Sequence, residues 1–215
     1  MDKNREVFDA IAESWYRVRH WPLLREELDW LAGRWEGGRL LNVGCGHGAD
    51  FLAFREGFEL WGVDFSLPML RQAQRYSAKF RFEAALVRGD MTALPFAAAS
   101  FDRAVAVASY HHLQGTEARH QALRELNRVL RSGGEAFLSV WNRRQPRFWL
   151  RSSEQLVPWR AREGTRYRYY HLFTYGELEA SLDKAGFTVL HLGPEKGYRV
   201  PVRQFSRNIC ALVRK

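Results

Sequence analysis

The amino-acid sequence predicts a doubly wound α/β fold, in which helices cover both faces of a mostly parallel β-sheet. Short apolar runs alternate with amphipathic segments between residues 40 and 140, which is typical of strand–helix units joined by right-handed crossovers. The run "RLLNVG" is mostly apolar, as in a strand covered on both faces, and a glycine-rich turn follows it directly. The 215 residues are expected to form a single domain over residues 1–215.

Two amphipathic helices are expected before the first strand. Residues 7–15 carry apolar side chains at helical spacing, and this helix is predicted to end near Arg19. Pro22 is expected to begin a second helix, whose apolar face runs to Trp35 and which ends at the glycine pair that follows. Residues 1–36 are therefore predicted to form an N-terminal helical cap.

The remaining elements follow from the same alternation. Strands are expected at residues 39–44, 58–64, 83–90, 101–110 and 135–141. Helices are expected at residues 50–56, 68–76 and 116–130, the last one closed by Ser132, Gly133 and Gly134. After an insertion at residues 143–173, we expect a helix at 175–186 and strands at 187–193 and 206–215. Too few residues join these two strands for a helix between them, so they should pair antiparallel.

Composition indicates a soluble protein without a membrane span. Hydrophobic residues make up 46% and charged residues 27%, and no apolar run approaches the ~20 residues that a bilayer requires. The first residues lack the basic and apolar regions of a secretion signal, which indicates a cytoplasmic location. Cys45 and Cys210 have no zinc-ligand spacing around them, so neither a metal site nor a disulfide is expected.

The positive charge is concentrated in the insertion. The formal net charge is +9, and residues 143–170 hold eight arginines against two acids. Aromatic side chains alternate with these arginines, which favours phosphate pairing and base stacking by a substrate-side RNA-binding segment. The alternative is a lid whose aromatics fill the core and whose arginines are solvated, with Trp159 as a packing anchor.

The glycine loop after the first strand predicts a nucleotide-like ligand. Gly44, Gly46 and Ala49 fit the G-x-G-x-x-A spacing of dinucleotide-binding loops, whereas Gly48 completes the G-x-G-x-G of methyltransferases. Asp64 ends the second strand, where it is expected to accept hydrogen bonds from ribose hydroxyls. The glycines alone leave nicotinamide dinucleotides and S-adenosylmethionine open.

Three further features favour S-adenosylmethionine. "RGDM" ends the third strand, with Asp90 expected at the adenine amino group and Met91 at the adenine face. "ALPFAAASFDRAVAVASYHHL" has the methyltransferase pattern around a fourth strand, and the chain closes with a helix and two antiparallel strands. Residues 40–140 thus resemble the core of class I S-adenosylmethionine-dependent methyltransferases. Asn42 stands where that family more often has an aspartate. The resemblance implies cofactor contacts from Asn42, Gly44, Cys45, Gly46, Asp64, Phe65, Met69, Gly89, Asp90, Met91, Ala108 and Trp15.

Four other stretches resemble a narrower family, the tRNA methyltransferases that esterify 5-carboxymethyluridine at the wobble position, including the domain fused to an AlkB-like oxygenase. They are "VFDAIAESWYRVR", "SYHHL", "VPW" at 157–159 and "RYYHLFTYGELE" at 168–179; Leu113 departs from the tryptophan often found there. The resemblance implies that His112 and Arg19 act on the acceptor. For both residues a purely structural role remains the alternative. It also implies that substrate is bound by Arg160, Arg168, Tyr169, His171 and Trp159.

Chemistry and the resemblance together define the expected reaction. A carboxylate with a pKa of ~4 is ionised at neutral pH, so its methylation needs no strong general base. The resemblance also implies a small zinc-binding activator protein, paired along the third strand as a sheet edge between Phe82 and Val87, with Phe82, Ala84 and Leu86 on one side. A small-molecule methyltransferase acting on a quinone or metabolite, a non-catalytic RNA-binding protein and a nicotinamide oxidoreductase remain the alternatives.

Overall fold

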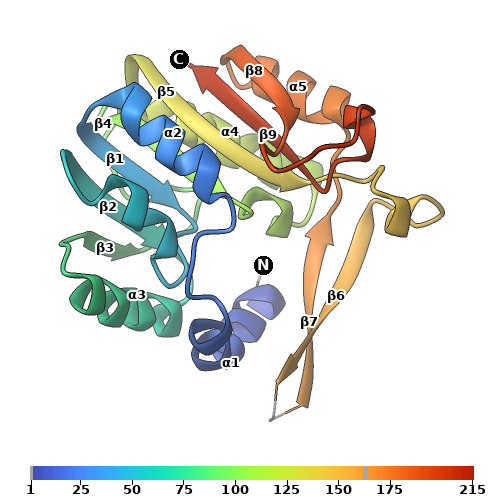
Figure 1. The fold of residues 1–215 in the computed structure, drawn as a ribbon, viewed down its shortest axis with the longest axis horizontal. Coiled ribbons are helices and arrows are strands. Elements are labelled where there is room, and N and C mark those ends of the chain that lie inside the picture. Colours follow the sequence, from blue (N-terminus) through green and yellow to red (C-terminus); the bar gives the residue numbers. More distant parts are fainter. Residues whose placement is uncertain (1, 162–163) are drawn as a thin grey trace.

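A seven-stranded sheet forms the centre of the protein, in a computed structural model that describes residues 2–161 and 164–215 (Figure 1). Its order within the described residues is β3-β2-β1-β4-β5-β9-β8. The first five strands in this order run parallel, and β9 runs antiparallel to both of its neighbours. The predicted doubly wound α/β fold is therefore confirmed. The strands are β1 (Gly38–Val43), β2 (Phe58–Asp64), β3 (Ala85–Arg88), β4 (Phe101–Val107), β5 (Leu130–Trp141), β8 (Thr188–Pro194) and β9 (Asn208–Arg214).

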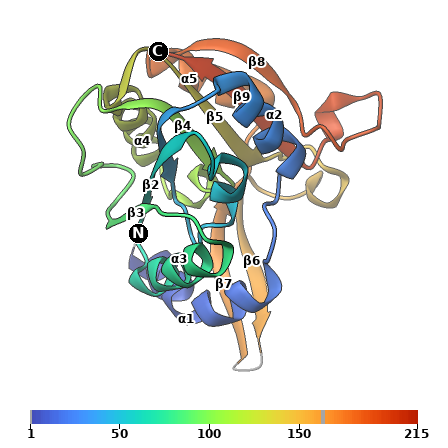
Figure 2. The same cartoon turned by 60° about the vertical axis from the view of Figure 1, so that its left-hand side comes forward.

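Helices cover both faces of the sheet (Figures 1 and 2). One buried cluster joins the strands to α2 (Arg25–Trp35), α3 (Leu67–Phe80) and the 3₁₀ helix η1 (Ala49–Phe54). A second cluster joins them to α4 (Thr116–Val129) and α5 (Tyr175–Lys184). The first helix, α1 (Asp2–Val18), packs instead on Met69 of α3 through Phe8 and Ile11.

Local sequence explains where several elements begin and end. The Ser66 hydroxyl accepts a hydrogen bond from the Met69 amide at 3.3 Å and caps α3, while the Thr174 hydroxyl caps α5 through the Glu177 amide at 3.2 Å. Gly37 has φ +144°, and a Cβ there would lie 2.7 Å from the Gly57 carbonyl oxygen. The turn after α2 therefore requires glycine.

Several sequence predictions about element bounds are wrong. The second helix begins at Arg25 rather than at Pro22, the helix expected at 68–76 extends to Phe80, and the strand expected at 135–141 begins at Leu130. Residues 50–56 were expected as a full helix, but only the short 3₁₀ helix η1 forms there. The helix at 116–130 ends at Val129, because Leu130 already pairs with Phe101 and the serine and two glycines after it belong to β5. The fourth strand ends at Val107, and η2 (Tyr110–His112) follows it as a separate turn of 3₁₀ helix.

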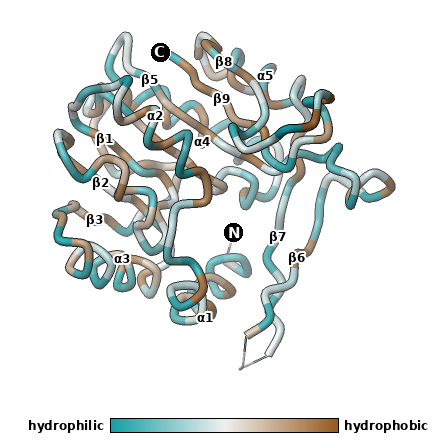
Figure 3. The backbone as a smooth tube through the Cα atoms, viewed as in Figure 1, coloured by the Kyte–Doolittle hydropathy of each residue, from teal (hydrophilic) through white to brown (hydrophobic). Residues whose placement is uncertain are grey.

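The basic insertion forms a β-hairpin that the sequence did not predict. Strands β6 (Glu154–Ala161) and β7 (Gly164–His171) pair antiparallel and extend away from the sheet beside α1 (Figure 1). The hairpin is largely hydrophilic (Figure 3). Arg162 and Glu163, two of the charges counted in the insertion, lie outside the described residues.

The third strand lies at an edge of the sheet, as predicted. It begins at Ala85, so Phe82 and Ala84 precede it rather than belong to it, and Phe82 is buried. Across the described ranges, no helix combines the length and apolar character needed to cross a bilayer.

Candidate active site

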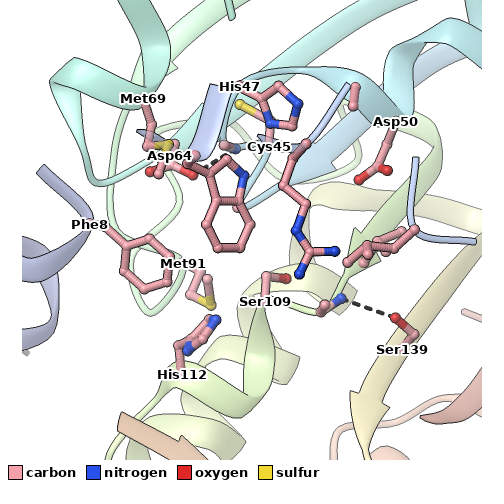
Figure 4. Close-up of a pocket in the computed structure, with 18 of the residues that line it drawn as sticks. Phe8, Cys45, His47, Asp50, Asp64, Met69, Met91, Ser109, His112 and Ser139 are labelled. Carbon is pink, nitrogen blue, oxygen red and sulfur yellow. Dashed lines mark hydrogen bonds between the residues drawn. The ribbon is translucent and has the colours of Figure 1, made fainter. Parts of the chain in front are cut away.

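A cavity lies at the carboxyl ends of β1, β2 and β4, and α1 contributes its outer wall (Figure 4). This is the place where ligands bind in open α/β sheets. Most of the residues predicted to bind cofactor or acceptor meet there. They are Trp15, Arg19, Gly44, Cys45, Gly46, Asp64, Phe65, Met69, Gly89, Asp90, Met91, Ala108 and His112.

The glycine loop gives the cavity a floor of bare backbone. Gly44 and Gly46 have φ of +71° and +53°. A Cβ on Gly44 would lie 2.6 Å from the Ser109 Cβ, whereas a Cβ on Gly46 would meet nothing within 4 Å. The first glycine is therefore required by packing, and the second leaves room for a ligand. Asn42 lies fully buried below the loop and does not line the cavity.

Asp64 joins the glycine loop to the second strand. Its Oδ2 accepts a hydrogen bond from the Gly46 amide at 2.8 Å, and its Oδ1 accepts one from the Ser66 amide at 2.9 Å. Burial raises the pKa of this carboxyl to about 6, although the two amides oppose the shift. The carboxyl is thus held in a fixed orientation, in which it can accept hydrogen bonds from a ribose.

Asp90 is oriented in a similar way after β3. Its Oδ1 accepts hydrogen bonds from both the amide and the hydroxyl of Thr92, each at 2.8 Å. The neighbouring Met91 lines the same part of the cavity. A carboxylate beside an apolar side chain suits the amino group and the face of an adenine, as the sequence predicts.

The end of β4 contributes backbone geometry that the sequence analysis missed. Ala108 has φ +53°, an uncommon conformation for a residue with a Cβ, and its amide donates to the carbonyl and the hydroxyl of Ser139 at 3.1 and 3.0 Å. The next residue, Ser109, also lines the cavity, and its buried hydroxyl has no hydrogen-bond partner among the described residues. Such strain and unsatisfied polarity are characteristic of ligand sites.

His112 is held at the cavity by α1 and β7. Its Nδ1 lies 3.0 Å from the Tyr169 carbonyl oxygen, while Asn4 bridges the same two residues by donating to the His112 carbonyl and accepting from the Tyr169 amide. A carbonyl only accepts, so Nδ1 carries the proton and Nε2 keeps a lone pair. Burial lowers the pKa of His112 to about 3, which keeps the ring neutral.

The five residues predicted to bind substrate do not line the cavity. Trp159 stacks on Trp15 with ring centres 4.9 Å apart and donates to the Ser14 hydroxyl at 2.9 Å. Arg168 is buried and donates to the Tyr170 hydroxyl at 2.9 Å. The buried His171 bonds to Glu177, Tyr169 supports His112, and Arg160 is exposed on the hairpin.

Tyr170 and Arg207 line the cavity instead. Tyr170 belongs to the aromatic residues of the insertion and to the stretch "RYYHLFTYGELE", but neither residue was predicted individually as a site residue. Burial raises the pKa of Tyr170, and four arginines oppose the shift: Arg168, Arg19, Arg147 and Arg207. Burial and then repulsion by Arg207 lower the pKa of Arg19, which outweighs the opposite effect of Tyr170. No carboxylate pairs with any of these four arginines in the described part of the chain. We call these four residues the arginine cluster.

No metal site accompanies the cavity within the described ranges, where no three His, Cys, Asp or Glu side chains gather as ligands. Cys45 lies buried in the glycine loop, and burial raises the pKa of its thiol well above the ordinary value. Such a thiol is a packing group rather than a nucleophile.

Sequence comparisons identify similar proteins over most of the chain. Residues 41–138 match the family described as Methyltransferase domain. A protein of Encephalitozoon cuniculi named "Putative methyltransferase" is 37% identical over 91% of this chain and 88% of its own length. The Schizosaccharomyces pombe tRNA (carboxymethyluridine(34)-5-O)-methyltransferase is 26% identical over 89% of this chain and 91% of its own. The Xenopus tropicalis enzyme of the same name, alkbh8, is 34% identical over 63% of this chain, which spans 20% of its length.

Solved structures show the same fold. An S-adenosylmethionine-dependent methyltransferase from Clostridium acetobutylicum superimposes with a TM-score of 0.76 at 14% identity, over 96% of this chain and 98% of that one. A Haloferax volcanii methyltransferase, solved in complex with the Trm112 methyltransferase activator, gives a TM-score of 0.72 at 19% identity, over 98% and 96% of the two chains.

Proposed function

The chain belongs to the S-adenosylmethionine-dependent methyltransferases, and on that premise we propose that it methylates the carboxylate of 5-carboxymethyluridine at the wobble position of tRNA. Membership resolves the ambiguity of the glycine loop, because the cofactor is S-adenosylmethionine rather than a nicotinamide dinucleotide. The names of the Schizosaccharomyces and Xenopus relatives support the choice of acceptor.

The residues of the cavity fit the cofactor. Gly46 leaves open space beside the loop, Asp64 and Asp90 offer carboxylate oxygens at the ends of β2 and β3, and Ser109 has an unpaired hydroxyl. S-adenosylmethionine supplies an electrophilic methyl group on a positively charged sulfur. The protein contributes orientation and charge, because a displacement of this kind proceeds when donor and acceptor are held in line.

The arginine cluster is the observation that carries the proposed acceptor class. Four guanidinium groups lie near enough to Tyr170 to act on its pKa and have no carboxylate partner among the described residues, and two of them, Arg19 and Arg207, line the cavity. Like charges gathered in this way repel one another, and an anion between them relieves the repulsion. A substrate carboxylate is such an anion, and its pairing with arginine is geometrically favourable.

The protonation state of His112 supports an acceptor that is already ionised. A ring whose pKa is about 3 is too weak a base to remove a proton at neutral pH. A carboxylate with a pKa of ~4 carries its negative charge without help. In this proposal Nε2 of His112 accepts a hydrogen bond from an N–H or hydroxyl group of the modified nucleoside and so orients it, because the carboxylate itself has no proton to donate.

The hairpin supports an RNA substrate. It carries Tyr170 at the cavity, and nearer its tip it exposes Arg160 and Tyr167 to solvent. Arginine next to an exposed aromatic ring suits a phosphate and an unstacked base, which are the groups that anticodon loops present. Residues 143–173 would then hold the tRNA while the cavity takes the modified base, and the single-domain enzyme would act in the cytoplasm.

An activator protein belongs to the same proposal. The open edge of β3 leaves backbone groups available for pairing with a second protein, and the Haloferax neighbour is solved with a Trm112 activator. We expect a small zinc-binding partner to pair along this edge. A fully active, monodisperse protein purified alone would contradict this part of the proposal.

Transfer of tritiated methyl from S-adenosylmethionine to tRNA tests the function. tRNA carrying 5-carboxymethyluridine is compared with unmodified tRNA, with and without the partner. Alkali-labile label on the modified tRNA alone is expected, because an ester hydrolyses in alkali. Absence of label under every condition, with cofactor binding confirmed, would contradict the proposal. Label on a small acceptor, unaffected by reversing the exposed Arg160 and Arg166 to glutamate, would favour a small-molecule methyltransferase.

A further inference from the structure

Asp50 is a carboxyl group of the cavity that the reaction described above does not use. It lies in the first turn of η1, directly after the glycine loop, and lines the cavity (Figure 4). Neither of its oxygens accepts a hydrogen bond from another described residue, and no described cation lies within ion-pair distance. The side chain is half-buried.

A purely structural role does not account for this carboxyl. An acid in the first turn of a helix commonly caps free amides, but Asp50 takes no hydrogen bond from η1. Burial raises its pKa to about 7, so the ionised form is unfavourable in the ligand-free protein. A carboxyl group that lines a cavity and whose ionised form is unfavourable without a ligand is a candidate for ligand binding.

The other two acids of the cavity are held by the protein in fixed orientations and are assigned to the ribose and the adenine of the cofactor. Asp64 accepts two backbone amides and Asp90 accepts both donors of Thr92. Asn42 has no charge and does not line the cavity. Among the described residues that line the cavity, Asp50 is therefore the carboxylate left for a cationic group.

The position of Asp50 identifies that cationic group. Both carboxyls act on the pKa of the Cys45 thiol in the glycine loop, and in the view of Figure 4 Asp64 and Asp50 lie on opposite sides of Cys45. If the adenine lies at Asp90 and the ribose at Asp64, the methionine part is the portion of the cofactor left to reach Asp50 in the same cavity. The methionine part ends in an α-ammonium, which carries a positive charge and three hydrogen-bond donors.

We propose that Asp50 binds the α-ammonium of the methionine part of S-adenosylmethionine and so fixes the amino-acid end of the cofactor. The interaction is a charge-assisted hydrogen bond inside a partly dehydrated cavity. It depends on the family assignment and not on the identity of the methyl acceptor.

Calorimetric titration with three ligands tests the assignment. S-adenosylhomocysteine carries the ammonium and the carboxylate, its decarboxylated amine carries the ammonium alone, and 5′-methylthioadenosine carries neither. Asp50→Asn should lower the affinity for S-adenosylhomocysteine and for its decarboxylated amine about tenfold to a hundredfold, which is the effect of losing a hydrogen bond to a charged group. The affinity for 5′-methylthioadenosine should stay within about twofold. Glu56→Gln, which removes an exposed acid just beyond η1, is the matched control and should change none of them.

A second measurement separates ligand binding from a structural role. Because the pKa of Asp50 is raised in the folded protein, its ionised form destabilises the fold above pH 7. Asp50→Asn should therefore raise the Tm of the ligand-free protein at pH 8, while it lowers the affinity for S-adenosylhomocysteine. Equal weakening of all three ligands, no weakening of S-adenosylhomocysteine, or a lowered Tm would overturn the proposal.

Discussion

Arg207 is the residue through which the proposed acceptor specificity is most directly tested. Its backbone is fixed, since its amide donates to Glu195 Oε1 at 3.3 Å and its carbonyl accepts the Asn142 amide at 3.1 Å, while its side chain lines the cavity. Arg207→Gln should raise the KM for the carboxylate acceptor roughly tenfold, the effect of losing ~1.5 kcal/mol from a charged hydrogen bond. Steady-state kinetics measures this change.

The control for Arg207 is an exposed arginine of the insertion outside the cavity. Arg143→Gln removes the same charge and should leave the KM within about twofold. Binding of S-adenosylhomocysteine should stay unchanged in both variants. A loss of cofactor affinity in Arg207→Gln equal to the rise in KM would assign Arg207 to the cofactor instead.

The pH dependence of turnover tests the role of His112. With its pKa near 3 and an acceptor pKa of ~4, nothing on the acceptor side titrates between pH 6 and 9. At saturating cofactor, kcat should therefore be constant over this range. His112→Ala should lower kcat by about tenfold or more without changing the shape of the profile. A rising limb near neutral pH that disappears in the variant would make His112 a general base.

The residues that line the cavity at the strand ends were predictable because strand ends and turns follow local rules. The glycine loop, Asp64 and Asp90 each come directly after an apolar run, and parallel strands bring such ends to one edge. Asp50, Tyr170 and Arg207 were not predictable. Their place at the cavity depends on how η1, β7 and the loop before β9 are folded back, which no short pattern records.

At the scale of elements, the hairpin is where sequence reasoning failed. Pro158 lies inside β6, and apolar or aromatic side chains occur on both faces, so the alternation typical of a strand is hidden. One face carries Trp159 and Arg168 against α1, while the other exposes Tyr167 at 56%. One face of the hairpin packs on α1 and the other is exposed to solvent. This explains why the sequence lacks a simple alternation of apolar and polar residues, and it leaves the exposed face for the proposed contact with RNA.

A double substitution on the hairpin tests its contact with RNA. Arg160→Gln with Arg166→Gln should reduce the slope of log affinity for tRNA against log salt by about 1.4, at ~0.7 for each phosphate contact on single strands. Filter binding over a salt series measures the slope. The control is Arg55→Gln with Arg124→Gln, which removes two arginines that are paired with glutamates. This double variant should leave the salt slope unchanged. Identical slopes for the two double variants would exclude the hairpin from RNA binding.

At the scale of the whole molecule, paired and unpaired charges lie at opposite ends of the sheet. Arg19 and Arg207 of the arginine cluster line the cavity at the carboxyl ends without a carboxylate partner among the described residues, and Asp50 lies there without a described cation as partner. Near the amino end of β5, Glu135 accepts hydrogen bonds from Arg34 at 2.9 Å, Arg214 at 2.9 Å and the Trp35 indole at 2.9 Å. The hydrogen bonds of Glu135 join α2, β5 and β9. We therefore expect the stability of the fold to depend on Glu135 and its partners, and the chemistry to depend on the charged residues at the carboxyl ends of the strands.

Acid unfolding tests this division. Burial acts to raise the pKa of Glu135, but the hydrogen bonds from Arg34, Arg214 and Trp35 outweigh it and lower the pKa to about 2. Because the folded pKa is depressed, the stabilisation is complete above the unfolded pKa of ~4.3 and is lost as the pH falls toward 2. Glu135→Gln should lower the free energy of unfolding at pH 7 by about 2 kcal/mol, since solvent screens the partly exposed arginines. The difference from the unmodified protein should shrink steadily below pH 4 in urea titrations, whereas Glu117→Gln, at an exposed ion pair with Arg124, should match the unmodified protein throughout. A deficit that is independent of pH would mean that Glu135 acts through packing and not through its charge.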